Sequence, residues 1–347
     1  MLISSVIEDR KDSNNYSLII DGCPDLNPDF SIMIPTFRRP DLVVDAIYSA
    51  INQSSRYLIE VVVVDNDDED EYYNEMLEII ENFSYGNIRY YKNCENIGMF
   101  NNWNRCIDLA RGKWITILND DDMLMKNFVE VVMRYSSLGG LLCSDFYYTK
   151  SEGPLRYKMF SEASVSCSDF KVLNLSDLFW KNPVNGSLGA AFEKKKAIEI
   201  GGFDDSWYPT SDYHFTFRYW ERYGVVKLKS KLAIYRWGRN ETMKAETLYG
   251  FLRNDKKMRI DILESYLSRR TLLRSVYIKI VDYILVRSIN YYATLNSDFS
   301  IEKALEQNGV KKNKLSKWLF FPVFVLIVKL LVKGLDYVSE KDLLRKV

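Results

Sequence analysis

Four consecutive valines, Val61–Val64, constrain the fold of this chain most strongly. They belong to the run Ile59–Val64, which has the length and β-branched content of a strand and is interrupted only by Glu60. Successive side chains of a strand point to opposite faces, so consecutive valines must be covered on both sides. Parallel sheets bury both faces in this way under their crossover helices. We therefore expect Ile59–Val64 to be an inner strand of a parallel sheet.

Strand-like and helix-like segments alternate through the N-terminal third of the chain. One helix is expected to begin at Pro40-Asp41, where proline stands in the first turn beside an acid. Alternation of this kind is typical of a doubly wound α/β sheet. The other expected strands are Ser31–Ile34, Ile88–Tyr91 and Trp114–Leu118, and the other expected helices are 71–83 and 99–110.

Three carboxylates in a row, Asp120–Asp122, follow the last of these strands. Adjacent acids repel one another, and burial without a counter-charge would be costly. A hard divalent cation that bridges to substrate phosphates would remove this conflict. The alternative is a solvated acidic turn that caps the next helix. Position favours the cation, because Pro35-Thr36 and Asp65-Asn66 also follow strands, and α/β sheets bind ligands at the carboxyl ends of their strands.

Charge and cysteine content exclude some functions. The 347 residues include 47 basic and 47 acidic side chains, a formal net charge of zero. General nucleic-acid binding would need a basic surplus, so we expect no nucleic-acid partner. The five cysteines are widely spaced and form no C-x-x-C pair, which argues against a disulfide framework or a zinc site. A reducing cytosol is the simplest compartment, and the N-terminus lacks the apolar core of a signal peptide.

Several motifs together resemble family 2 glycosyltransferases of the type that builds bacterial cell-surface polysaccharide or lipopolysaccharide O-antigen. They are Ser31–Arg39, Val62–Asn66, Asn96–Gly112 and Trp114–Leu124, followed by Gly201–Asp204, Ser211–Tyr213 and Arg218. The resemblance covers about residues 30–240 and is specific as a set. It implies a GT-A fold, a Rossmann-like, doubly wound mixed sheet, here with a C-terminal helical extension. It also implies hexosyl or deoxyhexosyl transfer from a nucleotide-sugar donor.

This sequence departs from the family pattern in the metal motif. Asn119 stands where the first acid of Asp-x-Asp-Asp is usual. The ligand could therefore be Asp121, or the set could be shifted to Asp120 and Asp122.

A second departure is Ser211, where an acid often precedes Asp212. In addition, Trp237 stands where a histidine is common, so donor-phosphate contact near Arg236 and Arg239 is left open.

The resemblance implies that the donor binds where the strands end. Asp65 is expected to accept an N–H group of the base, which could be uracil, thymine or guanine. Asp121 and Asp122 are expected to hold Mn²⁺ or Mg²⁺, which stabilises the diphosphate leaving group. For Arg38 and Arg39 the alternative is a solvated helix start. The expected donor-binding residues are Pro35, Thr36, Arg38, Arg39, Asp65, Asn66, Asn96, Gly98, Asn104 and Asp120.

The acceptor hydroxyl needs a general base, and Asp212 is the expected one. The alternative is that Asp212 caps the helix that begins there. His214 is a rival base, but side chains two apart on a helix point about 200° apart, so only one can face the sugar. A single base without a nucleophile predicts direct displacement with inversion. Trp207 and Tyr208 are expected to stack on acceptor sugars, with burial in the core as the alternative.

The expected organisation has three parts. Residues 1–28 form a loosely held lead-in, and 29–240 form the GT-A domain. Within that domain, 29–125 are the nucleotide-binding half and 126–240 the acceptor half. Residues 241–347 form a helical region.

The end of the helical region predicts contact with a membrane surface. Lys311–Val347 carries nine basic and three acidic residues, and the apolar run Trp318–Val328 is shorter than the ~20 residues that span a bilayer. A basic, apolar helix over 311–334 would lie on the inner face of the cell membrane, near a lipid-linked glycan acceptor. The alternatives are a helix packed on the catalytic domain or one buried in a homodimer.

Two other functions compete with this cytoplasmic, peripheral, inverting enzyme. Asn119 favours a non-catalytic sugar-nucleotide-binding or glycan-binding subunit with a degenerate metal site. A Rossmann-type oxidoreductase is disfavoured, because the first strand–helix turn, Pro35–Asp41, has no glycine and cannot form the G-x-G-x-x-G pyrophosphate turn.

Overall fold

The structure, a computed structural model, describes most of the chain as two compact units. The C-terminal boundary of the first unit, Gly238, lies close to the boundary expected near residue 240. Unexpectedly, Leu173–Pro183 and Ser206–His214 group with the C-terminal helices. The first unit comprises Met1–Val172, Val184–Asp205 and Phe215–Gly238, and the second comprises the rest. The described residues are 15–69, 71–83, 86–150, 153–155, 159–164, 170–184, 186–238, 244–267, 271–310 and 330–336.

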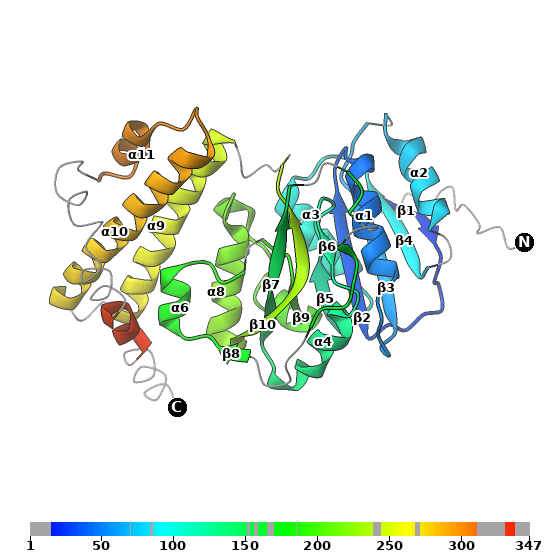
Figure 1. Cartoon of the computed structure of the whole chain (residues 1–347), viewed down its shortest axis with the longest axis horizontal. Helices are drawn as coiled ribbons and strands as arrows, with labels where there is room; N and C mark the ends of the chain where they lie inside the picture. The colour runs from blue at the N-terminus through cyan, green and yellow to red at the C-terminus, as the bar shows by residue number, and fades with distance from the viewer. Residues whose placement is uncertain are drawn as a thin grey trace, which may run out of the picture. The chain divides into compact units, whose positions relative to one another are not determined.

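The described part of the first unit is built on a ten-stranded mixed sheet (Figure 1). Its order is β1-β4-β3-β2-β5-β9-β7-β10-β6, with β8 paired to β10. The strands β4, β3, β2 and β5 are mutually parallel, and β9 runs antiparallel to both β5 and β7. The strands are β1 Tyr16–Asp21, β2 Phe30–Thr36, β3 Ile59–Asp65, β4 Ile88–Asn93, β5 Trp114–Ile117, β6 Met123–Leu124, β7 Leu141–Thr149, β8 Phe170–Val172, β9 Ala190–Glu193 and β10 Val225–Arg236.

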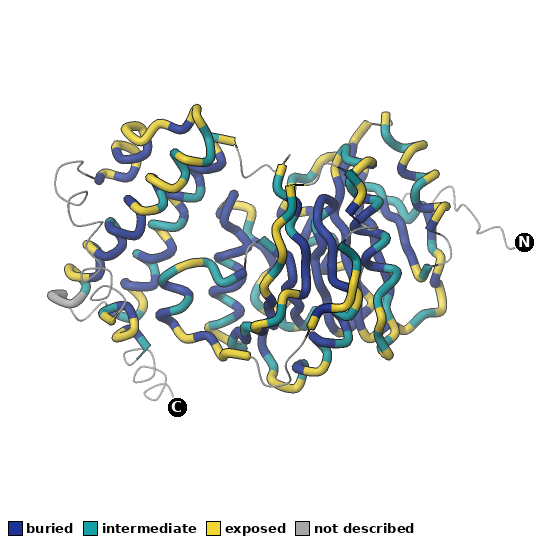
Figure 2. Tube along the Cα trace, viewed as in Figure 1, coloured by how far each residue is buried: buried dark blue, intermediate teal, exposed yellow. Residues whose placement is uncertain are grey.

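The valine strand lies inside the sheet and is covered on both faces, as its sequence predicts. Val61 and Val63 join the apolar cluster that includes Val43 and Ile47 of α1. All four valines are buried, and strands β2 to β5 are dark blue along most of their length in Figure 2. The helices of this unit are α1 Pro40–Ile51, α2 Tyr73–Asn82, α3 Met99–Leu109, α4 Phe128–Arg134, α7 Lys194–Glu199 and most of α8 Ser211–Tyr223.

The lead-in expected over 1–28 needs correction. Tyr16–Asp21 is strand β1, which pairs antiparallel with β4 at the edge of the sheet. Arg105 of α3 stacks on Tyr16, and Arg111 forms an ion pair with Asp21. These contacts come from distant parts of the chain, so the local pattern of residues 16–21 does not show them.

A buried ion pair lies near the amino ends of β3 and β4. Glu60 accepts hydrogen bonds from Arg89 Nη2 at 2.7 Å and from Ser31 Oγ at 2.5 Å, and Arg89 also donates to Tyr91 and to the Leu109 carbonyl. Both charges are shielded from water, with side-chain exposures of 2% for Arg89 and 0% for Glu60. The pair thus lies at the edge of the sheet opposite the carboxyl ends of the parallel strands.

Replacing Arg89 with methionine should lower the free energy of unfolding by about 3–5 kcal/mol, because Glu60 would remain buried without its cation. Urea unfolding measures this change. The matched control is Arg56→Met, since Arg56 is 71% exposed in its pair with Glu130 and should contribute less than about 1 kcal/mol. Equal stability of the two variants would contradict the assignment.

The second unit is helical. Leu252 of α9 and Ile289 of α10 pack with Phe299 and Leu305 in its apolar cluster. None of the described helices is long and apolar enough to cross a membrane. Residues 311–329, which carry most of the predicted membrane-surface segment, lie outside the described residues. The helices are α6 Leu175–Trp180, α9 Ala245–Leu267, α10 Thr271–Leu295, α11 Ile301–Gln307 and a short helix over 330–336.

Candidate active site

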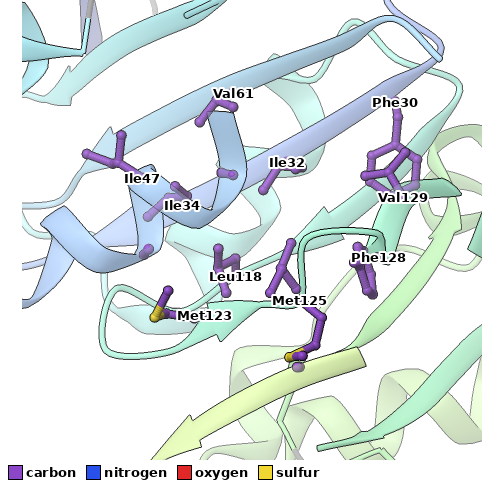
Figure 3. Close-up of a cluster of buried hydrophobic side chains, with 14 of the residues drawn as sticks. Phe30, Ile32, Ile34, Ile47, Val61, Leu118, Met123, Met125, Phe128 and Val129 are labelled. Atoms are coloured by element: carbon purple, nitrogen blue, oxygen red, sulfur yellow. The ribbon is translucent and has the colours of Figure 1, made fainter. Parts of the chain in front are cut away.

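Three neighbouring parallel strands of the first unit end in the polar segments that the sequence singled out. Thr36 ends β2, Asp65 ends β3, and Asn119–Asp122, the acid loop, follows β5. Strand β2 pairs in parallel with both β3 and β5, so these ends share one edge of the sheet. Leu118 and Met123 flank the acid loop and point into the core beneath α1 (Figure 3). The core thereby fixes both ends of the loop.

The carboxylates of Asp120 and Asp121 both contact the guanidinium of Arg39. Arg39 Nη1 lies 3.3 Å from Asp120 Oδ1 and 3.3 Å from Asp121 Oδ2. Thr36 Oγ1 donates to Asp120 Oδ2 at 2.9 Å. Two carboxylate oxygens from adjacent residues therefore face the same position, which a positively charged group occupies.

Asp122, which the sequence predicts as a metal ligand, accepts hydrogen bonds at both carboxylate oxygens, and its contact with a metal stays a prediction. Its Oδ1 accepts the backbone N–H of Arg236 at 3.0 Å, and its Oδ2 accepts from Asn119 Nδ2 at 3.2 Å. The side chain is fully buried. Asp122 is therefore an anchor of the acid loop. Asn119 supplies a donor to this anchor, which a carboxylate in the family's usual first position could not do.

Burial disfavours the charged form of all three acids of the loop. Burial raises the pKa of Asp120 to about 7, with the charge of Asp121 adding to the effect. Burial also raises the pKa of Asp121, and burial together with the Asp121 charge raises that of Asp122. The described residues contain no group of three or more His, Cys, Asp or Glu side chains arranged to hold a metal. Asp120 and Asp121 nevertheless fit a cation that completes its coordination with substrate phosphates and water, the usual arrangement for Mg²⁺.

Arg236 at the end of β10 holds the acid loop in place. Its Nε donates to the Asp121 carbonyl at 3.1 Å, and its Nη2 pairs with Asp45 of α1 at 2.5 Å. The arginine is buried, and Asp45 also accepts the backbone N–H of Leu155 at 2.8 Å. One side chain thus links the sheet, helix α1 and the loop. The sequence left the role of Arg236 undecided, and its contact with Asp45 spans 191 residues.

Asp65, the last residue of β3, holds the loop that follows the strand. Asp65 Oδ2 accepts from the Tyr90 hydroxyl at 2.9 Å, and Oδ1 accepts the backbone N–H of Asp67 at 3.0 Å. Burial raises the pKa of Asp65. Arg38, with a left-handed φ of 53°, pairs with Asp67 at 2.7 Å. Contact of Asp65 or Arg38 with a nucleotide stays a prediction.

A chain of buried amides joins the ends of β3 and β4. Asn93 Nδ2 donates to Asn66 Oδ1 at 2.9 Å and to Asn102 Oδ1 at 2.9 Å. Asn66 Nδ2 donates in turn to Asn96 Oδ1 at 2.8 Å, which also accepts the N–H of Gly98 at 3.0 Å. Gly98, with φ of 81°, is the residue before α3. The network fixes three of the predicted donor-binding residues relative to one another.

Asn104, a predicted donor-binding residue, bonds to the backbone of Phe203, and its contact with the donor stays a prediction. Its Nδ2 donates to the Phe203 carbonyl at 2.7 Å, and its Oδ1 accepts the Phe203 N–H at 2.7 Å. Gly202 lies so close that a Cβ there would stand 2.4 Å from Asn104 Oδ1. Asn104 therefore clamps the Gly-Gly-Phe turn onto α3 through both ends of its amide.

The second unit contains the predicted base and acceptor residues. Asp212, in the first turn of α8, accepts a hydrogen bond from Asn182 Nδ2 at 2.6 Å. Trp207 needs correction, because it is only 7% exposed, stacks on His214 at 4.2 Å and lies under the Lys257 ammonium. Its ring is structural and gives His214 a packing role. Tyr208 is 40% exposed, and its contact with an acceptor stays a prediction.

Sequence reasoning missed Asn93, Asp45 and Asn182. Asn93 had a signal, because it is the last residue of a parallel strand, the position that drew attention to Asp65. Asp45 lies among apolar residues of α1, where a lone acid indicates a buried partner. Asn182 lies in an irregular segment without a recognisable signal.

Comparison with known proteins agrees with this geometry. The sequence profile of glycosyl transferase family 2 matches residues 31–201, which include the ends of β2 and β3 and the whole acid loop. Residues 31–201 belong to glycosyltransferase family 2.

Two glycosyltransferases are similar in sequence to this chain. A GalNAc(5)-diNAcBac-PP-undecaprenol beta-1,3-glucosyltransferase of Campylobacter jejuni is 27% identical over 191 residues, which cover 52% of this chain and 56% of that protein. An uncharacterized glycosyltransferase of Methanocaldococcus jannaschii is 25% identical over 199 residues, covering 55% of this chain and 64% of that one. These matches span less than two thirds of either relative.

Solved structures show that the fold is GT-A. S. aureus TarS in complex with UDP-GlcNAc superposes with a TM-score of 0.55 at 16% identity, over 84% of this chain and 77% of that one. The mannosyltransferase PcManGT of Pyrobaculum calidifontis, in complex with GDP-Man and Mn²⁺, gives a TM-score of 0.52 at 15% identity, over 93% and 89%. The mixed sheet with added C-terminal helices is thus the architecture that the sequence predicts.

Proposed function

We propose that the protein is a glycosyltransferase that moves a sugar from a nucleotide-sugar donor to a glycan acceptor, with inversion and with a divalent cation. One observation carries this proposal. At the edge where β2, β3 and β5 end, Asp120 and Asp121 direct two carboxylate oxygens at the guanidinium of Arg39. The UDP-GlcNAc and GDP-Man complexes of the two solved neighbours support a nucleotide-sugar donor.

Asp121 and Asp120 would hold the cation, with Asp122 and Arg236 holding the loop behind them. A bound Mn²⁺ or Mg²⁺ would offset the negative charge that develops on the diphosphate leaving group. Arg39 would then be released from Asp120 and Asp121 to contact the phosphates. The Mn²⁺ complex of PcManGT supports this choice of cofactor.

Asp212 would act as the general base. The acceptor oxygen attacks the anomeric carbon as its proton passes to Asp212, and the bond from that carbon to the diphosphate oxygen breaks with its electron pair. Asn182 holds one oxygen of the carboxylate at 2.6 Å and so orients the other. A single displacement inverts the anomeric configuration.

The acceptor is proposed to be a lipid-linked glycan of bacterial surface polysaccharide biosynthesis. The undecaprenol-linked glycan in the name of the Campylobacter jejuni relative supports this choice. Attachment of 311–334 to the inner face of the membrane, and a homodimer, stay predictions.

Thermal unfolding with UDP, GDP, CDP and dTDP, each with and without Mn²⁺, tests donor binding. We expect one nucleotide to raise the melting temperature only when Mn²⁺ is present, because ligands stabilise the state that binds them. Release of nucleoside diphosphate from the matching sugar nucleotides, with undecaprenyl-diphosphate-linked N-acetylhexosamines as acceptors, then tests transfer. Nucleotide binding without product from any acceptor would favour a non-catalytic binding subunit.

Asp212→Asn should keep the Mn²⁺-dependent stabilisation by nucleotide but lower the transfer rate about 100- to 10,000-fold, the range that a general base contributes. Asp205→Asn, an exposed acid seven residues earlier, is the matched control. Transfer by Asp212→Asn at the wild-type rate would remove Asp212 as the base.

A further inference from the structure

Four aromatic side chains gather at the ends of the parallel pair β7 and β10. Phe146 and Tyr148 come from β7, Tyr235 from β10, and Trp237 directly follows β10; we name this set the aromatic platform. The ring centroids are 4.9 Å apart for Phe146 and Tyr148, 5.6 Å for Tyr148 and Tyr235, and 6.1 Å for Tyr235 and Trp237. The rings therefore contact one another edge to face in a row across two strands.

Strand pairing places these rings on one face. Tyr148 lies opposite Tyr235 in the parallel register, and the backbone N–H of Trp237 extends the pairing to the Thr149 carbonyl at 2.8 Å. Side chains two apart in a strand share a face, so Tyr235 and Trp237 lie together and Tyr147 lies on the opposite face. Breaks in the register before Ala233 bend β10 at this point, as bulges near functional sites often do.

One ring of the platform, that of Tyr148, is exposed to solvent. Tyr148 is 64% exposed, although its neighbours on the same face are half-buried. Single exposed apolar residues need no explanation, but an exposed ring continuous with other aromatic rings is typical of an interaction surface. The exposed part of the Tyr148 ring is therefore available to a ligand.

The platform adjoins the acid loop along β10. Arg236, between Tyr235 and Trp237, binds the Asp121 carbonyl and Asp122. On the platform's own face, Ala233 lies against Gly189, where a Cβ would stand 3.6 Å away. The same segment carries Ser187, whose hydroxyl donates to Asn119 of the acid loop at 3.5 Å. Buried residues of β10 and of the segment 187–189 thus link the platform to the acid loop.

We propose that the aromatic platform binds a pyranose ring of the acceptor glycan, with Tyr148 as its outer stacking residue. This inference rests on the proposed function. A pyranose has an apolar face of C–H groups edged by hydroxyls, which suits rings that are apolar across the face and polar at one end, as Tyr and Trp are. The platform replaces Trp207, whose ring is buried, as the stacking surface for the acceptor.

Tyr148→Ala tests this proposal. The variant should raise the KM for the acceptor about tenfold or more, a common loss when an aromatic anchor is truncated. Tyr148→Phe and Tyr148→Trp should restore most of the affinity, because they keep a ring. The KM for the donor and the slow donor hydrolysis without acceptor should stay within about twofold. Tyr147→Ala is the matched control, since Tyr147 is 41% exposed on the opposite face of the same strand.

Two acceptors separate the glycan from its lipid. We expect the same loss with the lipid-linked oligosaccharide and with the same oligosaccharide on a short water-soluble diphosphate ester. A loss confined to the lipid-linked acceptor would assign the rings to the lipid and overturn the proposal. An acceptor KM for Tyr148→Ala equal to wild type, in a protein that transfers sugar, would also overturn it. Absence of transfer by the wild-type protein itself would instead refute the proposed function.

Discussion

Replacing Asp121 with alanine is expected to lower sugar transfer about a thousandfold or more without lowering stability. The loss follows because a cation at a developing phosphate charge contributes several kcal/mol to the transition state, and each 1.36 kcal/mol is tenfold in rate. Stability should hold or rise, because burial already raises the pKa of Asp121 and its charge raises the pKa of Asp120 and Asp122. Removal of that charge relieves a conflict in the folded protein.

Three measurements separate these effects. Steady-state kinetics give the transfer rate, electron paramagnetic resonance of free Mn²⁺ gives metal affinity, and urea unfolding gives stability. Asp25→Ala, an exposed acid of the same unit away from the acid loop, is the control and should match wild type in all three. Wild-type transfer by Asp121→Ala, or equal Mn²⁺ affinity, would contradict the role of Asp121. A large loss of stability would mean that Asp121 serves the fold.

The first half of the sheet could be predicted from sequence because its signals are local. The expected strand Ile59–Val64 is β3 Ile59–Asp65, and the helix expected from Pro40 is α1 Pro40–Ile51. Strand β1 could not be predicted, because its pairing with β4 depends on residues more than 60 positions away. The antiparallel β9 and the long β10 could not be predicted either, because their neighbours in the sheet are distant in sequence.

The positions of polar residues at strand ends predict which of them share an edge of the sheet, but they do not predict the contacts of each atom. The ends of β2, β3 and β5 do share one edge of the sheet, as parallel strands require. Whether a carboxylate faces a ligand or its own backbone depends on donors elsewhere: Asp122 is occupied by Arg236 and Asn119, and Asn104 by Phe203. Likewise, the spacing of aromatic residues does not distinguish an exposed Tyr148 from a buried Trp207.

Arg236→Met is expected to lower stability about as much as Arg89→Met, because it leaves Asp45 buried without its cation. The free energy of unfolding should fall by about 3–5 kcal/mol. Transfer should fall as well, because Nε no longer holds the Asp121 carbonyl. The second substitution Asp45→Asn removes the unpaired charge and keeps an oxygen that can accept the Leu155 N–H, so Arg236→Met/Asp45→Asn should regain most of the lost stability.

The double variant separates the two roles of Arg236. We expect its Mn²⁺ affinity and transfer rate to stay about 10- to 100-fold below wild type, the usual cost of losing a group that orients metal ligands. Arg222→Met, whose exposed guanidinium donates to the Glu199 carbonyl, is the control for loss of an arginine. Full recovery of transfer in the double variant would show that Arg236 serves stability alone. Recovery of stability without transfer would show that the acid loop needs its Arg236 contact to stay in the arrangement that binds the cation.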